Sequence, residues 1–502
     1  MAKKRRSTPR ANTRSRAKSK PKPISANFQG LDSDMESGFG ESSATTGRKI
    51  VTILSDDPKD RKKVLDYFSA RDVKDMLETA DYEESAFSTE DASKSEAIVM
   101  DNLPILILNE KPNIMTALNA EAVTVADEET RRLFVIEEEM RHFPSGSPFG
   151  DASTGACGCD DSGGSTAANS GLSTWQQGYL EGVRAMADQL LGGKTSVQEM
   201  LSSGGAISGP MNFSQCVSND QSFAWGIKAT GVANSSLTGR GIKVAILDTG
   251  FEFGHPDANF ASRVIGHHSS VGGSAQDHDG HGTHVAGTAC GPRSPGFGTR
   301  RYGVASEAEI LVSRVLGPSG GNDSTILAGI NWAVGQNCDL INMSLGPRVC
   351  HMSRPYSTSH ERVAQVALQN GILIIAAAGN NSRRPHRTCQ VVGPAAAPSI
   401  VAVGAVDRCG RIAPFSNQGQ VSGGGEINLC APGVEVFSAW LNPSRHRSIP
   451  GTSMASPHVC GIAALIAEET DLRGLPLYQE LRRRAVNIGH RSADMGHGFV
   501  QV

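Results

Sequence analysis

Two largely apolar runs place the strongest constraint on the fold of this chain. They occupy residues 241–247 and 371–379, and each is bounded by glycine. Strands buried on both faces of a parallel sheet read as continuous apolar runs, whereas half-exposed strands alternate apolar and polar residues. The first run ends at Asp248 and the second at Asn380, so both polar side chains would emerge at the carboxyl edge of the sheet. The runs therefore predict an α/β fold with a mainly parallel sheet.

A serine motif at residues 451–459 suggests the chemistry of that edge. Ser453 follows a tight glycine turn and opens a helix of small residues, so its hydroxyl and its own N–H would face a bound molecule. A serine hydroxyl is a weak nucleophile and needs a base, an orienting carboxylate and an oxyanion stabiliser. His281 is the candidate base, Asp248 the candidate orienter and Asn380 the candidate oxyanion donor, together with the Ser453 N–H.

These four motifs resemble the subtilisin-like serine proteases, peptidase family S8, in identity and in the chain order Asp, His, Asn, Ser. The resemblance covers roughly residues 223–502 and implies a three-layer subtilisin-like domain. It also implies a serine endopeptidase, in which Asp248 holds the imidazole of His281, His281 moves the proton and Ser453 forms the acyl-enzyme.

The same resemblance assigns a substrate-binding strand. Residues 342–346 match the strand of the family that pairs with an extended peptide, which is recognition by strand addition. The expected substrate-binding residues are Ser344, Leu345, Gly346, Ala377, Ala378 and Gly379. The expected partners are therefore polypeptide substrates.

Each motif alone has a structural interpretation. A single Asp-Thr-Gly turn is more often a plain strand end than a catalytic site. His284 lies three residues after His281, but no Glu completes a zincin-type pattern, so we interpret it as structural. The joint occurrence of four motifs in one order is what favours catalysis.

The first 47 residues are expected to form a basic, disordered tail. Residues 1–23 carry ten Lys or Arg and no acidic residue. We do not expect nucleic acid as a partner, although the tail leaves that alternative open. No run reaches the 18 apolar residues of a membrane helix, so no membrane is expected. The tail also lacks the apolar core of a secretory signal, which favours the cytoplasm over secretion.

Residues 48–140 are expected to form a small α+β domain. Strands are predicted at 49–54, 73–79, 97–100, 103–108 and 122–125, with helices from 58 to Phe68 and near 113–118. This βαββαβ order is typical of a ferredoxin-like fold. Subtilases often carry a propeptide of this shape, so we expect a zymogen whose own N-terminal propeptide acts as an intramolecular inhibitor. An unrelated regulatory domain is the alternative.

Residues 141–215 are expected to form a Gly/Ser-rich linker that contains an amphipathic helix, with an apolar stripe at 175–191. The activation cut is predicted to fall between this linker and about residue 221. Residues 216–502 then form the peptidase domain.

Cysteine and metal chemistry are constrained less tightly. A Cys350–Cys389 disulfide would require an oxidising compartment, and without a secretory signal we favour reduced thiols throughout. Cys157 and Cys159 lack the second pair that a zinc site needs. The run 290–302, where many subtilases bind calcium, contains no carboxylate, so we expect no metal and no cofactor.

Two alternative functions stay open at this point. One is a dedicated maturation protease of a peptide-modifying pathway. The other is a cleavage-inactive scaffold that uses its substrate strand only to hold peptides. Intact catalytic positions argue against the scaffold.

Overall fold

The computed structural model describes residues 45–70, 73, 75–79, 95–109, 130, 132–144, 213 and 216–502, apart from 297, 353, 355, 421 and 422. Residues 1–44 of the expected tail at 1–47 lie outside these residues, whereas 45–47 belong to strand β1 (Thr45–Ile53), so that boundary is wrong. Residues 145–212 of the expected linker at 141–215, with its predicted amphipathic helix, also lie outside them, whereas 141–144 belong to strand β5 (Phe134–Pro144). We refer to residues 45–144 as the N-terminal domain and to residues 216–502 as the large domain. Among the described residues, no helix is both long enough and apolar enough to cross a membrane.

A seven-stranded sheet forms the centre of the large domain, in the order β14-β13-β12-β10-β6-β8-β7. Every neighbouring pair in it is parallel. The strands are β6 (Lys243–Asp248), β7 (Val264–Ser269), β8 (Glu309–Arg314), β10 (Leu340–Met343), β12 (Leu373–Ala377), β13 (Val401–Val406) and β14 (Leu429–Pro432). The two apolar runs are thus β6 and β12, and the predicted α/β fold is confirmed.

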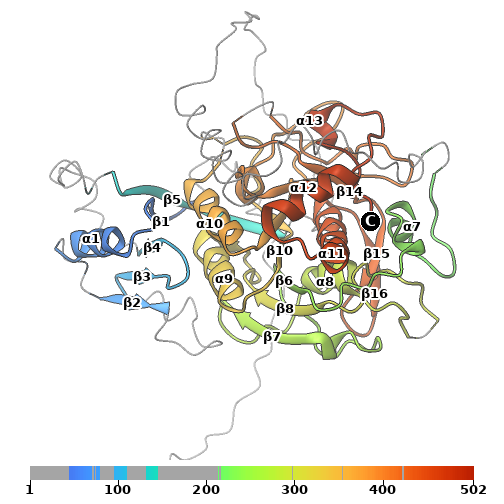
Figure 1. Cartoon of the computed structure of the whole chain (residues 1–502), viewed down its shortest axis with the longest axis horizontal. Coiled ribbons are helices and arrows are strands. Elements are labelled where there is room, and N and C mark those ends of the chain that lie inside the picture. The colour runs from blue at the N-terminus through green and yellow to red at the C-terminus, as the bar shows by residue number, and fades with distance from the viewer. Residues whose placement is uncertain are drawn as a thin grey trace, which may run out of the picture.

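Alternate residues of these strands are buried on opposite faces of the sheet. In β6, Val244 and Ile246 join the core on the side of α8 and α11, whereas Ala245 and Leu247 join the core on the side of α9 and α10. Burying such side chains is worth roughly 1.5–3 kcal/mol each for the larger ones. Helices therefore cover both faces (Figure 1), namely α8 (His281–Cys290) and α11 (Thr452–Thr470) on one and α9 (Asp323–Gly335) and α10 (Thr358–Gln369) on the other.

Shorter elements complete the large domain. The helical ones are α7 (Trp225–Ala229), η4 (Val232–Asn234), η5 (Ala261–Arg263), η6 (Gly393–Ala396), α12 (Gly474–Arg484) and α13 (Ser492–Met495). The strands are β9 (Gly321–Asn322), β11 (Leu345–Gly346) and the antiparallel pair β15 (Val436–Ala439) and β16 (His446–Ile449).

The N-terminal domain has its own sheet in the order β5-β1-β4-β3-β2. Its elements are β1 (Thr45–Ile53), α1 (Pro58–Ser69), β2 (Met76–Glu78), β3 (Ala97–Val99), β4 (Ile105–Leu108) and β5 (Phe134–Pro144). The pairs β1–β5, β1–β4 and β3–β4 are antiparallel, as the ferredoxin-like order requires. The helix predicted near 113–118 and the strand predicted at 122–125 lie outside the described residues.

Strand β5 is the main departure from the sequence-based prediction. It begins at Phe134 and ends at Pro144, so the expected domain limit at residue 140 falls inside it. Its sequence places three glutamates in a row, which hides the alternation that identifies a half-buried strand.

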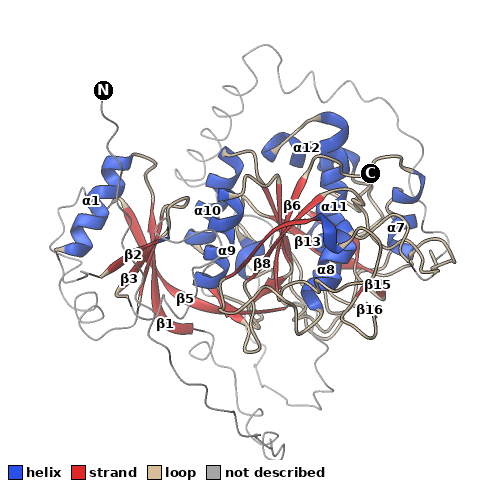
Figure 2. Cartoon of the chain, turned by 90° about the horizontal axis from the view of Figure 1, so that it is seen from below, coloured by secondary structure: helices blue, strands red, loops and turns tan. Residues whose placement is uncertain are grey.

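The two domains share apolar core. One face of the N-terminal sheet packs on α1 through residues such as Val51 and Phe68. The other face contributes Ile50 and Ile105 to the same buried cluster as Val363 of α10 and residues of α9. Figure 2 shows the N-terminal sheet between α1 and the α9–α10 side of the large domain, with β5 continuing along the large domain.

Two disulfides join loops of the large domain, Cys216–Cys409 and Cys350–Cys389. The expectation of reduced thiols throughout is therefore wrong for these four residues, because their loops meet in space although the sequence separates them. Free buried thiols lie at Cys290, Cys338, Cys430 and Cys460. Burial raises the pKa of Cys290 to about 12, which makes it an inert packing residue.

Candidate active site

A buried carboxylate–imidazole pair lies at the carboxyl end of β6. Asp248 is the last residue of that strand, and its Oδ1 accepts a hydrogen bond from Nδ1 of His281 over 2.7 Å. His281 is the first residue of α8, and both side chains are buried. The bond holds the imidazole in the tautomer that leaves Nε2 as the acceptor, which a general base requires.

The start of α8 is held against this strand end by a residue that the sequence analysis missed. Asp277 accepts hydrogen bonds through Oδ1 from the backbone N–H of Gly280 and through Oδ2 from the N–H and hydroxyl of Thr283. Gly282 lies so close to β6 that an added Cβ would meet the Gly250 carbonyl oxygen at 2.3 Å. The approach of His281 to Asp248 thus depends on the hydrogen bonds that Asp277 accepts at the start of α8, which act as a cap, and on the absence of a side chain at Gly282. The short spacing Asp-x-x-Gly-His was the available signal for the cap.

Ser453 is the second residue of α11, which packs against α8. Its Oγ donates to the carbonyl of Ser344 over 2.9 Å, and Oγ of Ser344 donates to the carbonyl of Ser453 over the same distance. Within the described part of the chain, no hydrogen bond joins Ser453 to His281, and the buried Nε2 of His281 has no hydrogen-bond partner. The hydrogen bond between the candidate nucleophile and its base is thus not formed in this structure, and catalytic hydrogen bonds often form only with substrate bound.

Asn380 follows β12 and is oriented by Thr452. Its Oδ1 accepts from both the backbone N–H and the hydroxyl of Thr452, each over 2.9 Å. This places the NH₂ end of the amide on the opposite side. Gly379 precedes it with a φ of 105°, and an added Cβ there would meet the Asn417 amide nitrogen at 2.4 Å. Only glycine fits this backbone, which sets the direction in which Asn380 leaves the strand.

The predicted substrate strand is paired with the N-terminal domain. β11 runs antiparallel to the end of β5, with Leu345 opposite Pro144 and Gly346 opposite Phe143. Ser344 lies just before it, bonded to Ser453. An extended segment of the chain's own N-terminal part therefore occupies the edge that strand addition would offer to a peptide.

The opposite edge of the same segment is paired as well. β9 runs antiparallel to β5, with Asn322 opposite Arg141 and Gly321 opposite His142. The end of β5 thus lies between β9 and β11, bonded through its backbone on both sides. Ala377, Ala378 and Gly379, also predicted as substrate-binding residues, are buried at the end of β12 and connect to α11 through the Gly379 N–H, which donates to the hydroxyl of Thr452.

The electrostatics suit a base at His281. Burial disfavours the charged imidazole, but the nearby Asp248 carboxylate overrides this and raises the pKa of His281 above its ordinary value. His284, one turn away, differs because burial lowers its pKa to about 3. Its Nε2 contacts the carbonyls of Val436 and Arg447, so it is a packed neutral histidine. This agrees with the structural role predicted for His284.

Comparison with known proteins adds to this geometry. Residues 239–487, which include all four candidate residues, match the model of the subtilase family. The chain is 37% identical over 291 residues to the major intracellular serine protease of Bacillus subtilis, covering 55% of this chain and 86% of that protein. It is 38% identical over 281 residues to subtilisin DY of Bacillus licheniformis, covering 55% and 94%. It is 34% identical over 289 residues to the intracellular serine protease of Paenibacillus polymyxa, covering 55% and 83%.

Proposed function

The chain belongs to the subtilase family and is a serine endopeptidase acting on polypeptides, and on that premise we propose that Ser453 is its nucleophile and that its N-terminal domain keeps it inactive. Asp248 and His281 act as orienter and base, and Asn380 completes the oxyanion hole. The observation that carries the proposal is the position of β5, which is paired with β11, directly after Ser344, whose carbonyl accepts from Oγ of Ser453.

The chemistry follows from the atoms at the edge of the sheet. Ser453 Oγ attacks the scissile carbonyl while Nε2 of His281 takes its proton, and His281 then returns the proton to the leaving amine. The negative oxygen that develops accepts from the Ser453 N–H and from the Asn380 amide. Water releases the acyl group by the same path in reverse. None of these steps uses a cofactor, and we propose that catalysis needs none.

Inhibition by the N-terminal domain is supported first by its backbone. A segment held between β9 and β11 excludes any other extended peptide from that position, because the strand edges can pair only once. The ring of Phe143 is also covered by the guanidinium of Arg348, 4.0 Å from the ring centroid. A substrate would have to displace this segment.

Charge complementarity supports the same docking. Glu137 accepts from the backbone N–H groups of Thr358 and Ser359 at the start of α10, each over 2.9 Å. Glu139 accepts from the N–H of Ser324 at the start of α9 over 3.0 Å. Each carboxylate thus satisfies orphan donors and meets the positive end of a helix dipole in the large domain.

Arg48 fastens Glu139 from the other side. Its Nε and Nη2 approach the two Glu139 oxygens at 2.6 and 3.0 Å, and Nη2 also donates to the hydroxyl of Ser324 over 2.8 Å. Glu139 itself is fully buried. Arg48 and Glu139 belong to the same domain, so their pair fixes the position of the two groups that bond Ser324 across the domain contact. Removing one member of such a buried pair leaves an uncompensated charge.

Two observations favour different cellular compartments for this protein. We propose the cytoplasm because two relatives are named intracellular serine proteases. The disulfides Cys216–Cys409 and Cys350–Cys389 favour an oxidising compartment instead. Counting thiols in protein extracted with a thiol-blocking reagent decides, since a cytoplasmic enzyme would yield these four cysteines blocked.

A labelling experiment tests the nucleophile. The full chain is incubated until peptide hydrolysis is constant, then treated with a fluorophosphonate probe, and the modified peptide is identified by mass spectrometry. We expect the label on Ser453, and we expect neither label nor hydrolysis in Ser453→Ala. Ser444→Ala, at an exposed serine, is the matched control and should behave as the parent. Unchanged labelling in Ser453→Ala would overturn the assignment.

A further inference from the structure

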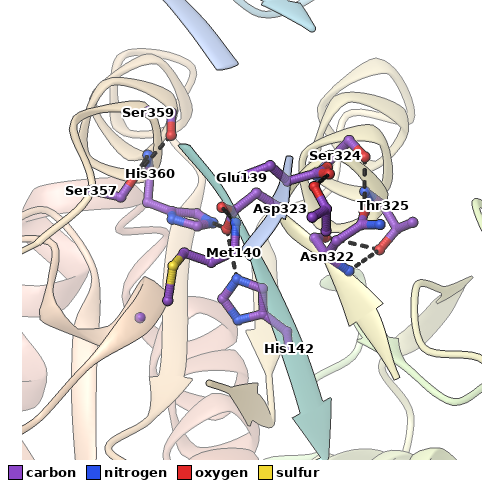
Figure 3. A network of polar contacts seen from close by, with 12 residues as sticks. Glu139, Met140, His142, Asn322, Asp323, Ser324, Thr325, Ser357, Ser359 and His360 are labelled. Atoms are coloured by element: carbon purple, nitrogen blue, oxygen red, sulfur yellow. Dashed lines mark hydrogen bonds and ion pairs between the residues drawn. The ribbon is translucent and has the colours of Figure 1, made fainter. Parts of the chain in front are cut away.

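Three buried side chains from three separate elements converge where the two domains meet. His142 comes from β5 of the N-terminal domain, Asp323 is the first residue of α9, and His360 lies in the first turn of α10. Figure 3 shows the two imidazoles beside the Asp323 carboxylate, and their ring centroids lie 5.9 Å apart. We call these three residues the interface cluster. None of them takes part in the catalytic arrangement described above.

The donor atoms of the interface cluster lie at metal-ligand range. Nε2 of His142 is 2.6 Å and Nε2 of His360 is 3.5 Å from Oδ1 of Asp323, and one ligand atom from each residue lies within 4.8 Å of the others. Oδ2 of Asp323 is engaged separately, as it accepts from the backbone N–H of Met140 over 2.6 Å. This fixes the carboxylate with Oδ1 toward both rings.

Both imidazoles have polar atoms without a hydrogen bond. Among the described residues, Nδ1 of His142 and both ring nitrogens of His360 are buried and lack a partner. Leaving a buried polar atom unsatisfied is unfavourable, so such groups call for an occupant. Two imidazole nitrogens and one carboxylate oxygen are the ligand types that zinc prefers.

A second histidine cluster differs in how its imidazoles are bonded. His255, Asp257 and His446 also lie close together. Here Nε2 of His255 contacts the carbonyl of Arg445 over 2.8 Å and its Nδ1 accepts from the Asp257 N–H, while Oδ2 of Asp257 accepts from Tyr302 over 2.6 Å and from His446 over 2.8 Å. The buried Oδ1 of Asp257 has no hydrogen-bond partner, but each imidazole of this cluster makes a hydrogen bond, whereas neither nitrogen of His360 does.

The charge balance at the interface cluster tolerates a cation. The positive ends of α9 and α10 oppose one, but Glu139 and Glu137 each sit at one of those ends and offset them. The imidazoles must be neutral to bind metal.

We propose that His142, Asp323 and His360 form a Zn²⁺ site shared between the N-terminal domain and the large domain. Tetrahedral zinc with ligands at about 2.0–2.1 Å separates its donor atoms by about 3.3 Å. The His360–Asp323 spacing already fits, and the His142–Asp323 hydrogen bond opens as the ion replaces its proton. A water molecule completes the four ligands. The ion would hold β5 in the position that a substrate peptide would occupy. This regulatory role of zinc rests on the proposed function.

The test measures metal binding and not proteolysis, so its outcome does not depend on whether the proposed function is correct. The full chain carrying Ser453→Ala is stripped with EDTA, and Zn²⁺ binding is measured by calorimetry together with the zinc-induced rise in melting temperature. We expect a site that His142→Gln or His360→Gln weakens by more than about 100-fold, since even loss of an outer partner costs 10–100-fold. Glutamine can still donate to Asp323, so the interface contact is kept.

Matched controls separate the outcomes. His446→Gln, in the second histidine cluster, and His351→Ala, at an exposed histidine, should bind zinc as the Ser453→Ala parent does. Ca²⁺ should not raise the melting temperature of the parent through the interface cluster. Each variant is checked for parental circular dichroism. Zinc binding of equal strength in the parent, His142→Gln and His360→Gln would overturn the proposal, as would a parent that binds no zinc; both results would identify a hydrogen-bonded histidine cluster only.

Discussion

Two buried Asp–His pairs with hydrogen bonds of similar length, one through Nδ1 and the other through Nε2, lie in different parts of this molecule. Asp248 and His281 are joined over 2.7 Å, and Asp323 and His142 over 2.6 Å. The first pair lies wholly within the large domain, at the carboxyl edge of the sheet and beside α11. The second pair spans two domains, at the start of a helix and without a nucleophile. An Asp–His hydrogen bond therefore does not by itself define a role. The role depends on the elements that carry the two residues.

The two Asp–His pairs also differ in whether they require the N-terminal domain. The Asp248–His281 pair depends on β6 and α8, both of which belong to the large domain. The Asp323–His142 pair exists only while β5 lies between β9 and β11. The following substitutions are chosen to act on one pair and to spare the other.

The largest effect is expected from removing an imidazole. His281→Ala should lower kcat by about 10⁶, the size found when subtilisin loses its catalytic histidine, because the serine then has no base. His142→Ala should leave kcat of the fully processed enzyme unchanged, since its pair is absent by then. Peptide hydrolysis after processing to completion by added parent enzyme measures both. Equal losses in the two variants would erase the distinction between the pairs.

The oxyanion donor should give the next largest effect. Asn380→Ala is expected to lower kcat by about 10²–10³ with little change in KM, which is the magnitude known from subtilisin for this kind of donor. Its amide acts on charge that develops only in the transition state. Steady-state kinetics on a peptide substrate measure the split, and a change confined to KM would argue that Asn380 binds the ground state instead.

Glu139→Gln should lower the free energy of unfolding of the full chain. The substitution leaves Arg48 partly buried without its carboxylate, a loss of about 3 kcal/mol. Urea unfolding of the full chain carrying Ser453→Ala measures it as a lowered free energy of unfolding.

Glu138→Gln is the control for that experiment. The adjacent Glu138 pairs with Lys49 at the surface, and its side chain is half exposed, so its loss should cost no more than about 1 kcal/mol. Equal costs for the two substitutions would show that β5 is not held through buried Glu139.

The smallest effect is a shift of the pH profile. A base with a raised pKa is neutral only above that pKa, so kcat/KM of the processed enzyme should fall tenfold per pH unit on an acidic limb placed above 6.5. Asp248→Asn should move this limb to lower pH while also reducing the rate, since the carboxylate raises the pKa of His281. A limb that stays in place would separate His281 from Asp248.

Sequence reasoning reached the large domain because its signals are local. The runs at 241–247 and 371–379 are single buried strands, and the positions of Asp248 and Asn380 follow from where those strands end. His281 and Ser453 each open a helix of small residues, as their motifs predict. In each case the deciding neighbours lie within a few residues of the side chain.

What sequence reasoning missed depends on contacts between distant segments. β5 is a strand because β1, β9 and β11 pair with it, and its Glu137 and Glu139 accept from helix starts that lie about 180 to 220 residues away. The same holds for Cys216–Cys409, and for His142, Asp323 and His360, which share no spacing pattern. Such partners become visible only once the chain is folded.

A time course of the purified full chain tests the central claim, that Ser453 is restrained by the N-terminal domain until the chain is cut. Gel analysis and peptide hydrolysis are followed together in the parent and in Ser453→Ala. We predict that hydrolysis is absent at first and rises in step with cleavage between residue 144 and about residue 221, and that Ser453→Ala stays intact and inactive. Full hydrolysis by the uncut parent would contradict the account, and so would equal cleavage of purified Ser453→Ala.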